Sequence, residues 1–230
     1  MNFFDPVIKD VSNLLDSCDK RKYPYDANNT WRDIGRNELV LKREEAFELD
    51  GVGFNLVTSG DILGDEIIVC GSDLGDISGD CAFARISLIS IDDIDDEQKA
   101  YDLIKKIEYV KYHFFPEGYM LRTSSRSHKE MVRVSASAIS KGISFEKIGN
   151  LMIEKYKQIK SVKNVRLIFV TDPSADYKQL ESLARKNHDI AETLNHVMNS
   201  VNFDCSTCSL KPVCDEVEGM KELHFKNAMG

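Results

Sequence analysis

The sequence predicts an α+β fold, in which a mixed or largely antiparallel sheet carries packed helices and a cysteine-containing metal segment follows at the carboxyl end. Three observations support this class. Apolar, β-branched segments such as GFNLVT and EIIVC occupy the middle of the chain. Segments with apolar residues three or four positions apart lie on both sides of them. Three of the six cysteines fall within ten residues, from Cys205 to Cys214.

Length and composition bound the classes of protein. A chain of 230 residues with 42% hydrophobic content can bury a substantial core. We expect an N-terminal helix and connecting segment over 1–35, an α+β core over 36–200 and the cysteine segment over 201–230. The absence of any run of 18 apolar residues predicts no membrane span, and the net charge of −8 argues against nucleic acid as a partner.

The opening residues predict a helix and a compartment. Asp5-Pro6 is typical of a helix start, and apolar residues then recur at helical spacing up to Cys18. The first ten residues have no basic leader followed by a long apolar run, so we expect a reducing, cytoplasmic location. Residues 19–35 favour a connecting segment, which Trp31 anchors on the core.

Period-two patterning predicts four successive strands over 38–41, 46–49, 53–58 and 66–70. With Asp50-Gly51 as one of the breaks, an antiparallel meander is the simplest arrangement. The glycine- and aspartate-rich stretch that follows is interpreted as a turn-rich loop. A metal held by its Asp73, Asp76 and Asp80 is the less favoured alternative, because these residue types are common turn formers. Residues 82–91 then predict a buried strand.

The second half begins with an acidic helix start and an amphipathic helix that ends before Pro116. In the basic segment that follows, Arg126, Lys129 and Arg133 have spacings that share one helical face. This face is interpreted either as a solvated surface or as a docking surface for an anionic group such as a phosphate.

Further helix and strand signals continue to residue 199. Gly142 fits a helix end and Ser144 the start of the next helix. Residues 165–170 predict a buried strand, and 174–186 and 189–199 predict two helices. The histidines on these helices, His188 and His196, are interpreted as structural or exposed rather than as metal ligands.

The cysteine segment DCSTCSLKPVC has the spacing C-x2-C-x5-C. Three thiolates from Cys205, Cys208 and Cys214 would suit a zinc ion or an iron–sulfur cluster. Buried, unligated cysteines are the alternative, which the polar neighbours disfavour. A fourth ligand is missing locally. The candidates are Cys18, Cys70, Cys81, His224, another chain and a small molecule.

The order of these segments resembles the beta subunit of the carbon monoxide dehydrogenase/acetyl-CoA synthase complex, in its middle domain and the start of its cluster-bearing domain. The resemblance covers roughly residues 36–216. It is carried by ELVLKREEAFELDGVGFNLV, EIIVCGSDLGDI, RVSASAISKGISFEKIGNLMIEKY and DCSTCSLKPVC. The family condenses a corrinoid-borne methyl group, carbon monoxide and coenzyme A in anaerobic one-carbon metabolism, at a nickel site bridged to a [4Fe–4S] cluster.

The resemblance implies that Cys205, Cys208 and Cys214 hold a [4Fe–4S] cluster. It also implies a corrinoid iron–sulfur protein or other synthase subunits as partners. For a CoA-type ligand, we expect phosphate contacts from Arg122, Arg126 and Arg133. The family's fourth cluster cysteine and its Cys-Gly-Cys nickel element have no counterpart in this sequence, so nickel chemistry is not expected.

Two alternatives stay open. One is a noncatalytic partner or chaperone module that docks on a corrinoid protein or synthase subunit. The other is a structural zinc site, with His224 as the fourth ligand to test. No general acid, base or nucleophile stands out in the sequence, so whether the chain catalyses a reaction is left open.

Overall fold

A computed structural model describes residues 2–36, 46–94, 96–124, 128–198 and 213. Its helices are α1 (Asp5–Leu14), α2 (Glu97–Tyr109), η2 (Val110–His113), α3 (Ala136–Ser140), α4 (Phe145–Lys157) and α5 (Tyr177–Met198). Its strands are β1 (Lys20–Pro24), β2 (Ala46–Thr58), β3 (Glu66–Cys70), β4 (Cys81–Ile91), β5 (Tyr119–Thr123), β6 (Lys129–Ser135) and β7 (Val162–Val170). None of the helices in the described part of the chain is long and apolar enough to span a membrane.

The seven strands form one sheet in the order β1-β3-β7-β4-β2-β6-β5. β2 pairs with β4 and β3 with β7 in parallel, whereas the remaining neighbours are antiparallel. The predicted α+β class with a mixed sheet is therefore confirmed. The antiparallel meander is wrong for the described strands, because 46–58 is a single strand and β3 lies between β1 and β7 rather than beside β2. Periodicity shows that a segment is a strand without showing which strand lies beside it. The strand predicted over 38–41 lies outside the described residues.

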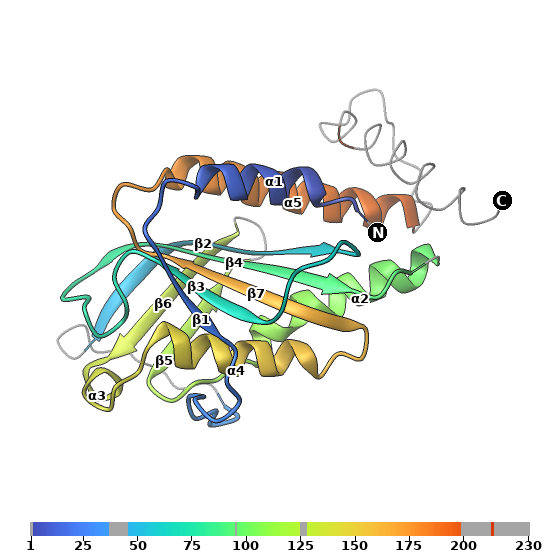
Figure 1. Cartoon of the computed structure of the whole chain (residues 1–230). Helices are drawn as coiled ribbons and strands as arrows, with labels where there is room; N and C mark the ends of the chain where they lie inside the picture. Colours follow the sequence, from blue (N-terminus) through green and yellow to red (C-terminus); the bar gives the residue numbers. More distant parts are fainter. Residues whose placement is uncertain (1, 37–45, 95, 125–127, 199–212, 214–230) are drawn as a thin grey trace.

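Helices cover both faces of the sheet (Figure 1). α1 and α5 lie together on one face, and α4 packs on the other, against β3 and β7. α2 contacts both β2 and α5. The buried apolar residues of both faces belong to one hydrophobic cluster, whose central strand β4 is buried from Phe83 to Ile91.

β2 is one strand of 13 residues that passes through Asp50-Gly51 without a turn. The predicted break there is wrong. A Cβ at Gly51 would lie 1.6 Å from the carbonyl oxygen of Phe83 on β4, so glycine serves close approach between neighbouring strands. The sequence signal was correct about a special backbone position and wrong about its cause.

The segment predicted as a connection contains β1, which pairs with β3 from Lys20↔Cys70 to Pro24↔Glu66. These N-terminal residues thus belong to the same sheet as the rest of the chain. Trp31 is partly buried against the core, and its Nε1 donates a hydrogen bond to the Glu117 carbonyl oxygen at 2.7 Å. The predicted anchoring role of Trp31 is confirmed.

The basic segment is a strand where a helical face was expected. Residues 129–135 form β6, which pairs with β2 and β5. Along β6 the buried side chains of Glu130, Val132 and Val134 alternate with more exposed ones. Lys129 and Arg133 still share a face, but they do so through the period-two geometry of a strand.

The helix ends around α4 follow the sequence signals. Gly142 has φ +78°, and Ser144 accepts a hydrogen bond from the Lys147 N–H at the start of α4. The two helices predicted over 174–186 and 189–199 are in fact one helix, α5, of 22 residues. His188 therefore lies in a helix interior, where its position relative to the sheet is fixed.

Candidate functional site: a cavity between α2 and α5

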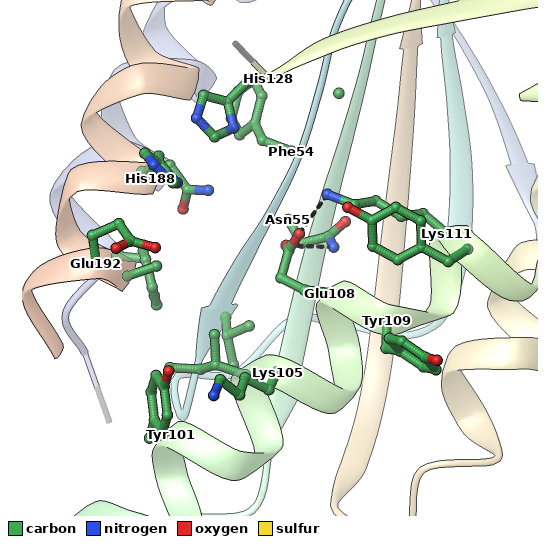
Figure 2. A pocket seen from close by; sticks show the side chains of 17 residues that line it. Phe54, Asn55, Tyr101, Lys105, Glu108, Tyr109, Lys111, His128, His188 and Glu192 are labelled. Atoms are coloured by element: carbon green, nitrogen blue, oxygen red, sulfur yellow. Dashed lines mark hydrogen bonds and ion pairs between the residues drawn. The ribbon is translucent and has the colours of Figure 1, made fainter. Parts of the chain in front are cut away.

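A cavity of about 210 Å³ lies where α2, α5 and the second half of β2 meet. Figure 2 shows His188 and Glu192 of α5 facing Lys105 and Glu108 of α2 across it, with His128 at one end. This volume is below the range of pockets for drug-sized ligands and well above the roughly 30 Å³ that one water occupies. The cavity therefore has the size for a small metabolite.

The cavity exists because β6 pairs with only the first half of β2. The last paired residues are Val52 and Lys129, and the Gly53 N–H then donates to the His128 carbonyl oxygen at 3.2 Å. From Phe54 to Thr58, β2 has β4 on one side and no described strand on the other. Side chains of α2 occupy this side without filling it.

His128 introduces an unusual backbone and an unpaired nitrogen. It has φ +51°, a left-handed conformation that is uncommon for residues other than glycine. Its Nε2 is buried and has no hydrogen-bond partner among the described residues. Burial, reinforced by His188 and Lys111, lowers the pKa of His128 to about 4. At neutral pH the cavity thus contains an uncharged imidazole that can donate or accept a hydrogen bond.

Asn187 supplies a second unpaired group. Its side chain is 7% exposed, and its Oδ1 is buried without a partner in the part of the chain that the structure describes. Asn187 lies three residues after Ala184 and three before Ile190, on the buried face of α5. An apolar residue would be expected at that position. Buried polar atoms in native proteins are nearly always hydrogen-bonded, so each exception requires an explanation.

A charged pair forms the wall opposite α5. Lys111 donates to Glu108 Oε2 at 2.6 Å, and Asn55 donates through Nδ2 to Glu108 Oε1 at 2.7 Å. Burial alone would lower the pKa of Lys111, but Glu108 raises it, so the ammonium stays protonated. Both oxygens of Glu108 are therefore occupied, and its charge is matched.

Asn55 connects the cavity to a buried ion pair. The side chains of Arg85 and Glu130 have no exposed area, and two hydrogen bonds of 2.7 Å join the guanidinium to the carboxylate. Arg85 also donates to Asn55 and Ser87, and Tyr156 donates to Asn55 Oδ1 at 2.8 Å. Burial alone would lower the pKa of Arg85, and Glu130 raises it, so Arg85 remains charged.

Gly53 makes room for this pair. A Cβ at Gly53 would lie 1.9 Å from Glu130 Oε2. Because Arg85 holds the carboxylate at both oxygens, the Glu130 side chain cannot move aside without losing those bonds. The glycine is thus required by a side chain on a neighbouring strand.

Of the arginines predicted to bind an anion, the two that the structure describes, Arg122 and Arg133, do not line this cavity. Arg122 on β5 pairs with Met131, and Arg133 pairs with Met120, so both arginines share one face of the β5–β6 hairpin. Arg122 is exposed, whereas Arg133 donates to Glu48 Oε2 at 2.7 Å. Arg126 lies outside the described residues. The structure therefore brings Arg122 and Arg133 together, with a carboxylate beside one of them.

The predicted cluster ligands Cys205, Cys208, Cys214 and His224 also lie outside the described residues. Among the residues that are described, no group of three histidine, cysteine or acidic side chains has the arrangement of a metal site. Cys18 and Cys70 are neighbours. Burial raises the pKa of Cys18, and raises that of Cys70 to about 12.

The loop of Asp73, Asp76 and Asp80 follows the favoured turn interpretation. Asp73 Oδ1 accepts hydrogen bonds from the Leu74 and Phe145 N–H groups, and Asp80 accepts one from the Glu48 N–H. Asp76 forms an ion pair with Arg21 at 3.7 Å. Each carboxylate thus has its own partner within the protein.

Sequence reasoning missed the cavity because its walls come from segments that are separated along the chain, in β2, α2 and α5. Two features of the sequence could have indicated buried polar sites. Asn187 interrupts the apolar face of a helix, and Arg85 interrupts an apolar strand. A polar residue at a core position requires a partner, although the sequence does not say which residue supplies it.

Comparison with known proteins adds no assignment to this geometry: neither the family models nor the curated proteins searched contain a match to the chain.

Proposed function

We propose that this protein is a binding module that holds a small polar molecule in the cavity between α2 and α5. One observation carries the proposal: His128 Nε2 and Asn187 Oδ1 are buried, lack partners among the described residues, and belong to residues that line the same cavity. A buried polar atom without a hydrogen bond costs about 1–3 kcal/mol. A ligand that bonds to both atoms would recover this free energy on binding.

Ordered water is the competing explanation, since a polar cavity of this size also suits a few water molecules. The two explanations differ in what substitution does. Replacing Asn187 by leucine removes the unpaired acceptor. If the cavity holds only water, the Asn187→Leu substitution should change stability alone. If the cavity holds a ligand, the substitution should also abolish binding of a specific compound.

The test is to purify the protein under native conditions, release bound small molecules by denaturation and identify them by mass spectrometry. We expect one compound at near-stoichiometric level with the natural sequence and its loss from the Asn187→Leu variant. Asn28→Leu, at an exposed turn residue, is the matched control and should retain the compound. In parallel, a screen of small metabolites by thermal shift should find compounds that raise Tm. An empty screen together with no co-purified compound would refute the proposal.

The spacing of Cys205, Cys208 and Cys214 favours a second candidate function. In this proposal the chain is a cytoplasmic [4Fe–4S] protein of anaerobic one-carbon metabolism, similar to the acetyl-CoA synthase beta subunit without its nickel ligands. It would act with a corrinoid protein or a synthase subunit, either in chemistry or as a noncatalytic module. α5, which forms one wall of the cavity, ends seven residues before Cys205.

Anaerobic purification with iron and sulfide analysis and EPR tests this second candidate. The expected result is about four irons per chain and their loss when the three cysteines become serine. A colourless protein with stoichiometric zinc would overturn it and favour the structural zinc alternative, for which His224 is the variant to examine next. If the serine variant still captures a corrinoid protein, the noncatalytic role is favoured.

The predicted CoA contacts form a separate part of that proposal. Arg122, Arg126 and Arg133 would bind phosphate groups through charge-assisted hydrogen bonds. Calorimetry with CoA should show weaker binding when all three become alanine. An unchanged affinity in the triple variant would rule out these contacts.

A further inference from the structure

The charges around the cavity indicate which class of molecule it accepts, given that the cavity is a binding site as proposed above. Its lining contains two lysines, Lys105 and Lys111, and two glutamates, Glu108 and Glu192, so their formal charges cancel. Lys111 and Glu108 are joined at 2.6 Å, and the second Glu108 oxygen accepts from Asn55. An ionic ligand that used Lys111 or Glu108 would have to separate this pair.

The second lysine is also engaged. Lys105 Nζ lies 4.5 Å from the centre of the Tyr101 ring. A hydrogen bond with Tyr101 and the nearby carboxylates of Asp102 and Glu192 raise the pKa of Lys105. Its positive charge is therefore stabilised by groups of the protein itself, including one acid on α5.

The two groups that lack partners are neutral. Asn187 Oδ1 requires a donor, and the uncharged His128 imidazole offers one nitrogen as donor or acceptor. An ion that contacted only these two neutral groups would lose hydration without gaining an opposite charge from them, which is unfavourable. An amide group carries a donor and an acceptor side by side and no charge.

Two exposed aromatic side chains are among the residues that line the cavity. Tyr109 is 61% exposed and Tyr112 is 44% exposed, and both line the cavity. Their rings lie 6.0 Å apart, and the ring of His113 lies 4.4 Å from that of Tyr109. Exposed aromatic side chains offer flat faces on which a planar ring can stack.

We propose that the cavity binds an uncharged, planar amide, whose amide group bonds to Asn187 and His128 and whose ring contacts the exposed tyrosines. This ligand class is distinct from the anionic CoA expected at the arginines of the β5–β6 hairpin. Neither Arg122 nor Arg133 lines the cavity, and the two sites would take molecules of different charge.

Two pairs of probes of nearly equal shape test the proposal: nicotinamide against nicotinate, and benzamide against benzoate. Binding is measured by calorimetry and by NMR of the histidine imidazoles, with the His128 resonances assigned by their absence from the His128→Asn variant. We expect at least one amide to bind about tenfold or more tightly than its acid, with little dependence on salt. Binding should shift the His128 resonances and disappear in Asn187→Leu but not in Asn28→Leu.

The outcomes separate this inference from the proposed function. Equal or tighter binding of the acids would overturn the inference while supporting a binding function. The same conclusion would follow if neither amide binds but a compound from the wider metabolite screen shifts the His128 resonances. If no probe and no screened compound perturbs His128, both proposals fail.

Discussion

Two clusters of polar side chains meet at Asn55, and they differ in how well their hydrogen bonds are satisfied. Around Arg85 and Glu130, four donated bonds from the guanidinium end on protein acceptors. In the cavity, His128 Nε2 and Asn187 Oδ1 end on none that the structure describes. The first cluster is complete without a partner molecule, and the second is not. Buried polar groups are thus mutually satisfied in the first cluster, whereas in the second their unpaired atoms are the basis of the proposed binding function.

Breaking the complete cluster should have the largest effect. Glu130→Gln keeps the shape of the side chain and leaves the Arg85 charge buried without its carboxylate, so we expect a loss of about 3–5 kcal/mol in the free energy of unfolding. Urea denaturation measures it. The control is Glu48→Gln, which removes a partly exposed partner of Arg133 and should cost about 1 kcal/mol or less. Equal effects of the two variants would contradict this account of Arg85–Glu130.

The double variant Arg85→Met with Glu130→Leu sharpens the same test. Replacing both ions by apolar residues removes the uncompensated charge, so we expect it to be more stable than Glu130→Gln alone. If the double variant is less stable than Glu130→Gln, the unpaired charge of Arg85 does not explain the stability lost in Glu130→Gln.

Gly53→Ala should rank next. The added Cβ would lie 1.9 Å from Glu130 Oε2, which Arg85 prevents from moving freely, so we expect a loss of about 2–3 kcal/mol. Gly75→Ala is the matched control, because a Cβ there meets no atom within 4 Å. A difference in urea midpoint between the two alanine variants measures the effect, and its absence would show that the ion pair can relocate.

A pH-dependent effect should arise from His128. Its pKa falls from an ordinary value of 6.5 to about 4 in the folded protein, so the unfolded chain binds more protons between these values. Stability from this group is complete above pH 6.5 and is lost as pH falls toward 4. Because the site is partly screened by solvent, we expect about 2 kcal/mol rather than the full shift.

His128→Asn tests this prediction. Asparagine tolerates the left-handed backbone and does not titrate. Stability measured from pH 7 to pH 4 should fall less steeply in the variant than in the natural sequence. Parallel curves would show that His128 does not carry the dependence.

The smallest effect should have the opposite sign. Asn187→Leu replaces an unpaired buried acceptor by an apolar side chain of similar size, so we expect the ligand-free protein to be unchanged or more stable by up to about 1 kcal/mol. Thermal unfolding with and without a bound amide separates stability from binding. A clear loss of stability in the ligand-free variant would mean that Asn187 is satisfied in solution.

The sequence predicted some elements well, and for physical reasons. These elements are the start of α4 at Ser144, the end of the preceding helix near Gly142, and the buried strands β4 and β7. All of them depend on short-range rules of capping and apolar patterning. The helix expected at Arg133 was wrong because charge spacing outweighed the alternating Val132 and Val134 in that prediction. The break expected at Gly51 was wrong because glycine there serves contact with another strand.

The sequence by itself determined the α+β class, the helix ends and the presence of polar residues such as Arg85 and Asn187 at apolar positions. Only the tertiary structure decided that Arg85 meets Glu130 whereas Asn187 meets an open cavity with His128. The physical reason is the separation along the chain over which each effect acts. Capping and periodicity act within a few residues, whereas the partner of a buried polar group depends on strand order and on where β6 stops beside β2.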